Sequence, residues 1–219
     1  HRMSNKLLMA KDKNKDQSYF LWQLNQEQLK HILFPVGDYT KKEVRKLAGK
    51  FGLPTVATPE SQEVCFIQKT TNEFLTRYIK LKPGKIVNTK REVLGKHQGL
   101  PFYTIGQRKG LGLSGGPYWA LDKDFKKNLL IVTKNEKDLL KKELTFKNAN
   151  WLSPNQSLRD ATGQAGKIKA KIRYRSKPAS GVLTINNRFI FDKPQRAITP
   201  GQSVAFYKGE ELLGGGIIC

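Results

Sequence analysis

Cysteine and histidine are scarce in this 219-residue sequence, which has two of the former and three of the latter. Two cysteines, Cys65 and Cys219, exclude a disulfide framework and a cysteine-rich zinc site by number alone. The histidines are scattered without the spacing of metal ligands, so we expect no metal. Nor do so few histidines allow a Ser-His-Asp or Cys-His constellation to be assembled.

Long apolar runs are also missing. No segment approaches the roughly 20 apolar residues that span a bilayer, and no charged-then-apolar leader is present. We therefore expect a cytoplasmic protein without membrane insertion, with a mitochondrial location as the alternative for a eukaryotic source. The sequence begins His-Arg-Met, which indicates a fragment or the remnant of a tag.

Acidic residues are few compared with basic ones. The chain has 18 Asp and Glu against 40 Lys and Arg, a formal net charge of +22. The excess is +4 over residues 1–75, +11 over 76–147 and +7 over 148–219. Such a charge indicates a polyanionic partner, and we expect nucleic acid, although a Lys-rich genome would raise the Lys content everywhere.

Helical patterns occupy the first part of the chain. Asp16 and Ser18 offer N-cap oxygens ahead of apolar residues from Phe20 to Leu33, whose spacing predicts a helix with one buried face. Two capping boxes predict two further helices. They pair Thr40 with Glu43, in a helix that ends at Gly52, and Thr70 with Glu73, in a helix whose inward face is Phe74, Leu75, Tyr78 and Ile79.

Strand-like runs occupy the rest. A short run from Val64 to Ile67 holds Cys65, and after Pro83 short β patterns are broken by Gly and Pro, with 129–133 the clearest strand. Beyond Asn148, five runs are spaced as the strands of a small barrel or sandwich: 167–175, 182–185, 188–191, 203–207 and 212–218. Asn186 and Asn187 suit a tight turn between two of them.

Cations alternate with apolar residues along one of these runs. A strand here would place five cations on one face: Lys167, Lys169, Lys171, Arg173 and Arg175. The ordinary interpretation is a solvated face, but such faces usually mix in Thr, Glu or Gln. We therefore favour an anion-binding strand whose Arg side chains reach phosphate oxygens.

Two other features have competing interpretations. A basic cluster, Gln107-Arg108-Lys109, precedes a glycine-rich stretch that lacks the βαβ context of a dinucleotide site, and we expect a turn-forming loop there. A lone cysteine in an apolar run such as Val64–Ile67 is, by spacing alone, more often a buried inert thiol than a reactive one.

Ordered motifs across nearly the whole chain resemble one family, the tRNA-specific 2-thiouridylases, MnmA/TrmU. In the first part the motifs are Lys15-Asp16-Gln17-Ser18-Tyr19-Phe20-Leu21, Phe34-Pro35 with Gly37, and Ser61-Gln62-Glu63-Val64-Cys65-Phe66-Ile67. In the middle they are His97-Gln98-Gly99 and the run from Tyr103 to Gly112. Near the end they are Arg173-Tyr174-Arg175, Ala197 to Gln202, and Gly214-Gly215-Gly216.

The resemblance implies an α+β protein in three parts. Residues 1–82 would be the helical tail of an ATP-pyrophosphatase-type α/β catalytic domain, 83–147 a small central β domain, and 148–219 a tRNA-binding β-barrel. It implies a tRNA uridine 2-sulfurtransferase: ATP activates O2 of the wobble uridine, and a persulfide supplies sulfur. We expect tRNA and a sulfur donor, such as a cysteine desulfurase or a sulfur-relay protein, as partners of a monomer.

The resemblance also implies roles for individual residues. Cys65 matches the persulfide-carrying cysteine, against the expectation from spacing, and a persulfide sulfur is a strong nucleophile. Predicted tRNA contacts are Lys15, Asp16, Gln17, Arg173, Tyr174 and Gln202, to which we add the nearby cations Arg175, Arg108 and Lys109. Glu63 and Gln68 replace glycines of many members.

The family's Ser-Gly-Gly-Val-Asp-Ser loop for ATP and its first catalytic cysteine are not in this sequence. We therefore expect no cofactor-binding residue here, with ATP held by a preceding segment, and no complete turnover by this chain alone. The alternative is a non-catalytic tRNA-binding module, distinguished by whether Cys65 takes up sulfur. A weaker third hypothesis is a DNA-binding β protein, which would prefer duplex DNA over tRNA at matched salt.

Overall fold

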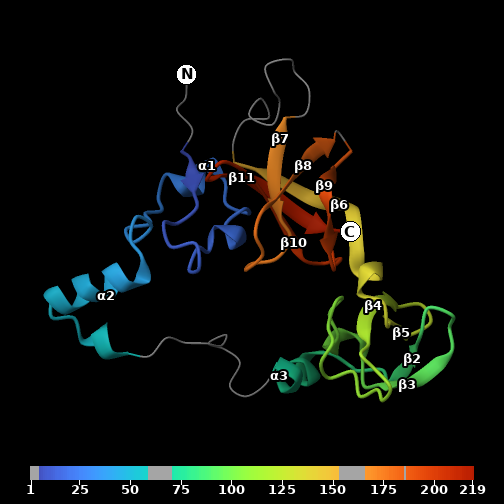
Figure 1. Ribbon diagram of the computed structural model, residues 1–219. Coiled ribbons are helices and arrows are strands. Elements are labelled where there is room, and N and C mark those ends of the chain that lie inside the picture. Colours follow the sequence, from blue (N-terminus) through green and yellow to red (C-terminus); the bar gives the residue numbers. More distant parts are fainter. Residues whose placement is uncertain (1–4, 59–70, 153–165, 185) are drawn as a thin grey trace. The chain divides into compact units, whose positions relative to one another are not determined.

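The computed structural model describes residues 5–58, 71–152, 166–184 and 186–219 (Figure 1). Packing divides the chain into two compact units. The first comprises His1–Thr58, Lys142–Gln195 and Thr199–Cys219, and the second Pro59–Lys141 and Arg196–Ile198. The domain boundaries predicted from the sequence, at residues 82 and 147, rest on changes in sequence pattern and on the family resemblance, not on packing. They stay a prediction.

A closed β-barrel forms the body of the first unit (Figure 1). Around the barrel the strand order is β11-β10-β7-β8-β9-β6, and β6 pairs again with β11. The strands are β6 (Leu140–Trp151), β7 (Lys167–Lys171), β8 (Ala179–Thr184), β9 (Arg188–Arg196), β10 (Ser203–Lys208) and β11 (Glu211–Ile218). The barrel predicted for the end of the chain is confirmed, and Asn187, with φ of +50°, lies in the turn before β9.

Aromatic rings fill the barrel. The Phe206 ring centroid lies 5.0 Å from that of Phe146, 5.4 Å from that of Trp151 and 5.4 Å from that of Phe189. Phe189 also makes an edge contact with Phe191 at 4.9 Å. Because rings at these spacings pack in offset or edge-to-face geometry, they hold the strands together over a small interior.

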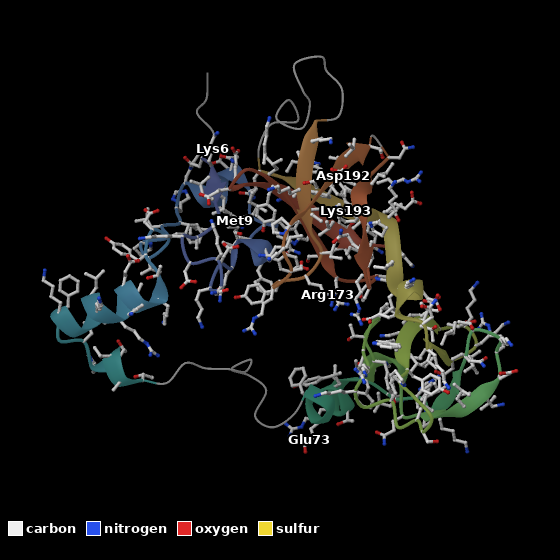
Figure 2. The ribbon with its side chains drawn as sticks, in the orientation of Figure 1. Lys6, Met9, Glu73, Arg173, Asp192 and Lys193 are labelled. Atoms are coloured by element: carbon white, nitrogen blue, oxygen red, sulfur yellow. The ribbon has the colours of Figure 1, made fainter. Side chains whose placement is uncertain are left out.

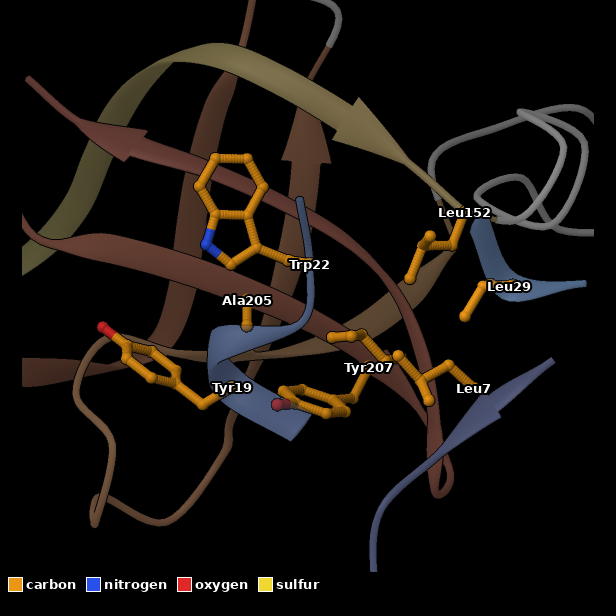
Figure 3. Packing of buried hydrophobic residues seen from close by; sticks show 8 residues of the cluster. Leu7, Tyr19, Trp22, Leu29, Leu152, Ala205 and Tyr207 are labelled. Carbon is orange, nitrogen blue, oxygen red and sulfur yellow. The ribbon is translucent and has the colours of Figure 1, made fainter. Parts of the chain in front are cut away.

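The N-terminal segment covers the outside of this barrel. Strand β1 (Leu7–Leu8) pairs with β11, and Tyr19 and Trp22 lie over Ala205 and Tyr207 of β10 (Figure 3). A Cβ atom at Gly215 would lie 2.7 Å from Trp22 Cγ, so only glycine lets the indole approach β11 this closely. The start of the chain is therefore part of the barrel's packing.

The helix predicted from Phe20 to Leu33 is wrong. The structure has only a 3₁₀ turn, η1 (Ser18–Phe20), and one turn of helix, α1 (Gln26–Leu29), capped by Asn25. The Asn150 amide donates to the carbonyl oxygens of Trp22 and Leu24 at 2.6 and 2.7 Å. Because those carbonyls bond to the barrel, the barrel contact replaces the predicted helical ladder.

The helix predicted from Thr40 is confirmed as α2 (Lys41–Lys50), followed by the 3₁₀ turn η2 (Pro54–Ala57). Both bonds of the capping box are present, since Thr40 Oγ1 accepts from Glu43 N at 3.3 Å and Glu43 Oε2 accepts from Thr40 N at 2.6 Å. Gly52, with φ of +62°, ends the helix as predicted. No residue of α2 is fully buried.

The second unit is built on a four-stranded sheet of order β3-β2-β5-β4, in which only β2 and β5 are parallel. Its elements are α3 (Thr71–Tyr78), β2 (Gly84–Val87), β3 (Val93–His97), η3 (Leu100–Phe102), β4 (Trp119–Asp124), β5 (Leu129–Thr133) and η4 (Glu136–Leu139). The strand predicted at 129–133 and the helix predicted after Thr70 are both confirmed.

The inward face predicted for that helix is wrong for two of its four residues. Tyr78 is 74% exposed and Ile79 is 38% exposed. The described core of this unit consists of sheet residues such as Ile86 and Leu130 together with Leu100, Tyr103 and Leu111. Because strands and loops fill this core, the end of α3 is left in solvent.

Candidate nucleic-acid interface

The predicted face of five cations does not form. Strand β7 ends at Lys171, and of its three lysines two are exposed while Lys171 is only 5% exposed. The N-terminal segment covers that position and places Asp16 against it. A sequence pattern cannot show such a cover, because the cover comes from a segment 155 residues earlier in the chain.

The two arginines of the pattern lie on a turn after β7. The turn is closed by Ser176, whose Oγ donates to the Arg173 carbonyl oxygen at 2.8 Å and whose N–H donates to it at 3.1 Å. Figure 2 labels Arg173 at the lower rim of the barrel. The turn thus moves Arg173, Tyr174 and Arg175 off the strand and onto the rim.

An open depression of about 490 Å³ lies at this rim, within the first unit. It brings together Arg173, Tyr174, Arg175 and Gln202, four of the nine residues predicted to contact tRNA. The rest of its lining is Tyr19, Phe20, Gly201 and Ser203. Two walls therefore face each other, one from the N-terminal segment and one from the turn after β7.

Two aromatic rings and a cation are in contact in the depression. Phe20 is 57% exposed, and its ring centroid lies 4.8 Å from that of Tyr174. The Arg175 guanidinium carbon lies 5.9 Å from the Tyr174 ring centroid, within the range of a cation–π contact. An exposed ring beside guanidinium groups provides the two contacts that single-stranded nucleic acid uses, base stacking and phosphate pairing.

Hydrogen bonds fix both walls to the barrel. Tyr19 Oη donates to the Ser203 carbonyl oxygen at 2.7 Å, and an Arg173 guanidinium nitrogen donates to Thr199 Oγ1 at 3.2 Å. Burial raises the pKa of Tyr19 to about 12, against an opposing effect of the Arg173 charge. Tyr19 is therefore a neutral hydroxyl near pH 7 and remains a donor.

Gln202 lies on a tight turn that lines the depression. Gly201, with φ of +86°, permits the turn, and Gln202 N donates to the Thr199 carbonyl oxygen at 3.2 Å. Among the described residues, no donor reaches the buried Gln202 Oε1. The backbone of Gln202 is thus fixed while one side-chain acceptor is not used internally.

The three residues predicted near the start of the chain do not line the depression. Lys15 and Gln17 are exposed, whereas Asp16 is 3% exposed and its carboxylate faces inward. Asp16 Oδ1 accepts from the backbone N–H of Ala10 and of Ser18. The turn thus presents Lys15 and Gln17 to solvent on either side of a buried anchor.

Arg108 and Lys109 belong to the second unit. Both are exposed, and the Arg108 guanidinium carbon lies 5.9 Å from the centroid of the Trp119 indole. Gln107 closes this turn by accepting from Thr104 N at 3.0 Å and donating to the Lys109 carbonyl oxygen at 2.9 Å. The positive φ angles of Gly110, Gly112 and Gly115 confirm the turn-forming loop predicted after it.

Cys65 and the strand predicted around it lie outside the described residues, as does Thr70 of the third capping box. Cys219 is exposed at the end of β11. In the described parts of the chain no three His, Cys, Asp or Glu side chains gather as metal ligands. No helix among the described residues has both the length and the apolar character needed to cross a membrane.

Sequence reasoning missed the wall formed by Tyr19 and Phe20 and the pairing of Lys171 with Asp16. Tyr19 and Phe20 belong to a motif shared with the family, but neither was predicted as a site residue, and Phe20 was assigned to a helix with one buried face. The available signal was two adjacent aromatic residues directly after a polar segment. Nothing in the sequence indicated the partner of Lys171.

Three family profiles match consecutive parts of the chain. They are described as the tRNA methyl transferase HUP domain, over residues 1–69, the tRNA methyl transferase PRC-barrel domain, over 72–134, and the aminomethyltransferase beta-barrel domain, over 141–218. The three matches follow one another almost without gaps.

Curated relatives match over nearly the whole chain. The tRNA-specific 2-thiouridylase MnmA of Alkaliphilus oremlandii is 44% identical over 225 residues, covering 97% of this chain and 60% of that protein. The proteins of the same name from Moorella thermoacetica and Gloeothece citriformis are 44% and 46% identical, over 97% of this chain and 60% and 61% of their own lengths. The chain thus spans about three fifths of the length of these relatives.

Proposed function

Because this chain belongs to the tRNA-specific 2-thiouridylase family, MnmA/TrmU, we propose that it holds tRNA and carries sulfur in the 2-thiolation of the wobble uridine. The observation that carries the tRNA-binding part is the depression at the barrel rim, where the tilted rings of Phe20 and Tyr174 are in contact beside Arg173 and Arg175. In this assignment the guanidinium groups contact phosphate, and the exposed ring of Phe20 stacks with a base of the anticodon loop.

Sulfur transfer requires an activated uridine, because oxygen is a poor leaving group from a urea-like carbonyl. ATP supplies that activation by transferring AMP to O2, with release of pyrophosphate. The terminal persulfide sulfur of Cys65 attacks C2, and AMP leaves with the former O2. A second thiol then attacks Cys65 Sγ, which breaks the S–S bond, leaves the new sulfur on C2 and joins the two thiols as a disulfide.

ATP is not assigned to the described residues. The described part of the segment matched by the HUP profile, residues 5–58, contains no glycine-rich loop between a strand and a helix, the arrangement that usually cradles phosphates. A cysteine desulfurase or a sulfur-relay protein is the proposed donor of sulfur. We also assign the protein to the cytoplasm as a monomer.

The sulfur-carrier role is tested by loading the chain with a cysteine desulfurase and free cysteine and then measuring peptide masses. We expect a gain of one sulfur on the peptide that contains Cys65. The gain is lost in Cys65→Ser and kept in Cys219→Ser, which is the matched control. A chain that binds tRNA but takes up no sulfur on Cys65 would instead be a non-catalytic tRNA-binding module.

The tRNA role is tested by measuring the affinity for a tRNA transcript with a wobble uridine over a series of salt concentrations. Replacing Arg173 and Arg175 together by Ala should weaken binding about tenfold or more and lower the slope of log affinity against log salt by one to two. An unchanged slope would remove both arginines from the interface. Duplex DNA of matched charge is the competitor, and a preference for it would contradict tRNA as the ligand.

A further inference from the structure

A buried ion pair lies behind the two walls of the depression. Lys171 Nζ lies 3.6 Å from Asp16 Oδ2, and the side chains are 6% and 2% exposed. Asp16 belongs to the N-terminal segment and precedes Tyr19 by three residues, while Lys171 ends β7 and precedes Arg173 by two. The pair therefore joins the two segments close to the depression. Along the chain, each partner is at most about 11 Å from the first lining residue of its own segment.

Hydrogen bonds complete the surroundings of the Asp16 carboxylate. Oδ1 accepts the backbone N–H groups of Ala10 at 3.1 Å and Ser18 at 3.2 Å, and Oδ2 accepts the Ser18 hydroxyl at 3.0 Å. Ser18 Oγ also lies 3.2 Å from the Tyr207 hydroxyl. The network thus extends from the N-terminal turn into β10, and each carboxylate oxygen has two partners.

Tyr207 takes part as a neutral hydroxyl. Burial raises its pKa, an effect opposed by the Ser18 hydrogen bond and increased by the nearby Asp16 charge. The two charged groups of the network are the Asp16 carboxylate and the Lys171 ammonium group. Removing only one of them leaves the other buried without its ionic partner, which is strongly unfavourable.

A buried ion pair adds little net stability, because the cost of removing both charges from water offsets most of their attraction. Such a pair does restrict geometry. The Asp16 carboxylate has all its partners only in the position where the Lys171 ammonium group and the three hydrogen-bond donors surround it. Here that restriction acts directly between the wall formed by Tyr19 and Phe20 and the wall formed by Arg173 to Arg175.

We propose that Lys171 is a positioning residue for tRNA binding, which fixes Asp16 and thereby sets the Phe20 wall against the Tyr174 wall. This role rests on the proposed function of the depression as a tRNA site. In this assignment Asp16 acts from inside the protein, and the exposed side chains of the same turn, Lys15 and Gln17, are oriented by it. Lys171 itself does not touch RNA.

The test compares Lys171→Met with Lys169→Met in the 219-residue chain. Both variants remove one positive charge from the outer face of β7, but Lys169 is exposed. With the tRNA transcript used above, we expect Lys171→Met to weaken binding by about tenfold and Lys169→Met by about twofold or less, the size of a peripheral charge effect. Affinities are compared at a temperature where circular dichroism shows both variants folded.

A second variant separates positioning from stability. Lys171→Met combined with Asp16→Asn removes both charges, so we expect most of the melting temperature to return while the affinity stays low. In this double variant the nuclear Overhauser contact between the Phe20 and Tyr174 rings should weaken. Recovery of affinity together with stability would overturn the positioning role, as would wild-type binding by Lys171→Met alone.

The proposed function is tested separately, by the variant in which Arg173 and Arg175 are both replaced by Ala. If those replacements weaken tRNA binding and the Lys171 variants do not, only the positioning role fails. If the arginine replacements also leave binding unchanged, the depression is not the tRNA site and both proposals fail.

Discussion

The two units of the molecule carry their cations in different surroundings. The net charge is +13 for the first unit and +9 for the second, which is nearly the same charge per residue. Yet the depression lined by arginines and by the exposed ring of Phe20 lies in the first unit. In the second unit Arg108 lies over Trp119 and Lys134 lies over Tyr118, and both rings pack against buried clusters. Charge density alone therefore does not locate a binding site.

The difference comes from how the first unit is assembled. Its depression needs two segments far apart in the sequence, which hydrogen bonds and the Asp16–Lys171 pair fix to each other. The cation–aromatic contacts of the second unit are made along a single sheet and its loops. We infer that the first unit provides specific contacts to tRNA and the second mainly a general electrostatic attraction.

The largest expected effect is that of removing the indole joining the N-terminal segment to the barrel. Trp22 is 3% exposed, and Trp22→Ala should lower the free energy of unfolding of the first unit by about 3–5 kcal/mol, as is typical for buried tryptophan. Hydrogen exchange followed by mass spectrometry should show faster exchange in β10 and β11, with β2 and β5 unchanged. Equal acceleration in both sheets would mean that the units unfold together.

The next effect concerns stacking in the depression. Phe20→Ala should weaken tRNA binding by about 1–3 kcal/mol, the range for one base stacked on an aromatic ring. Because Phe20 is 57% exposed, the melting temperature should change little. Phe20→Tyr keeps the ring and is the matched control. Equal loss with both variants would indicate that the ring is not a stacking surface.

A smaller effect is expected in the second unit. Replacing Arg108 and Lys109 together by Ala should weaken tRNA binding by about 1 kcal/mol or less at moderate salt, because exposed charges contribute mainly through screened attraction. The loss should disappear as salt is raised, whereas the loss from Phe20→Ala should remain. Titrations at low and high salt measure both. A salt-independent loss from Arg108 and Lys109 would place a specific contact in the second unit as well.

Features governed by neighbouring residues were predictable from the sequence, and features governed by distant ones were not. The capping box of Thr40 with Glu43 correctly placed α2, because both partners lie within one turn. The helix from Phe20 failed because Asn150 binds two of its carbonyl oxygens. Family resemblance predicts Arg173, Tyr174 and Gln202 as tRNA contacts, and the structure adds that they share one depression with Tyr19 and Phe20.

The smallest effect distinguishes α2 from the barrel within the first unit. The pKa of Glu43 is lowered from its ordinary value of 4.5 to about 2. The largest cause is the hydrogen bond from the Thr40 backbone N–H, followed by that from Lys11. Because this carboxylate is more acidic in the folded state, its contribution is full above pH 4.5 and is lost as pH falls toward 2. We expect the amide signal of Thr40, which donates to Glu43 Oε2, to shift over that range, while the signal of Leu213 in β11, which is 1% exposed, stays fixed. Glu43→Gln keeps a hydrogen-bond acceptor and should remove the shift. If the shift persists in this variant, the transition belongs to another carboxylate.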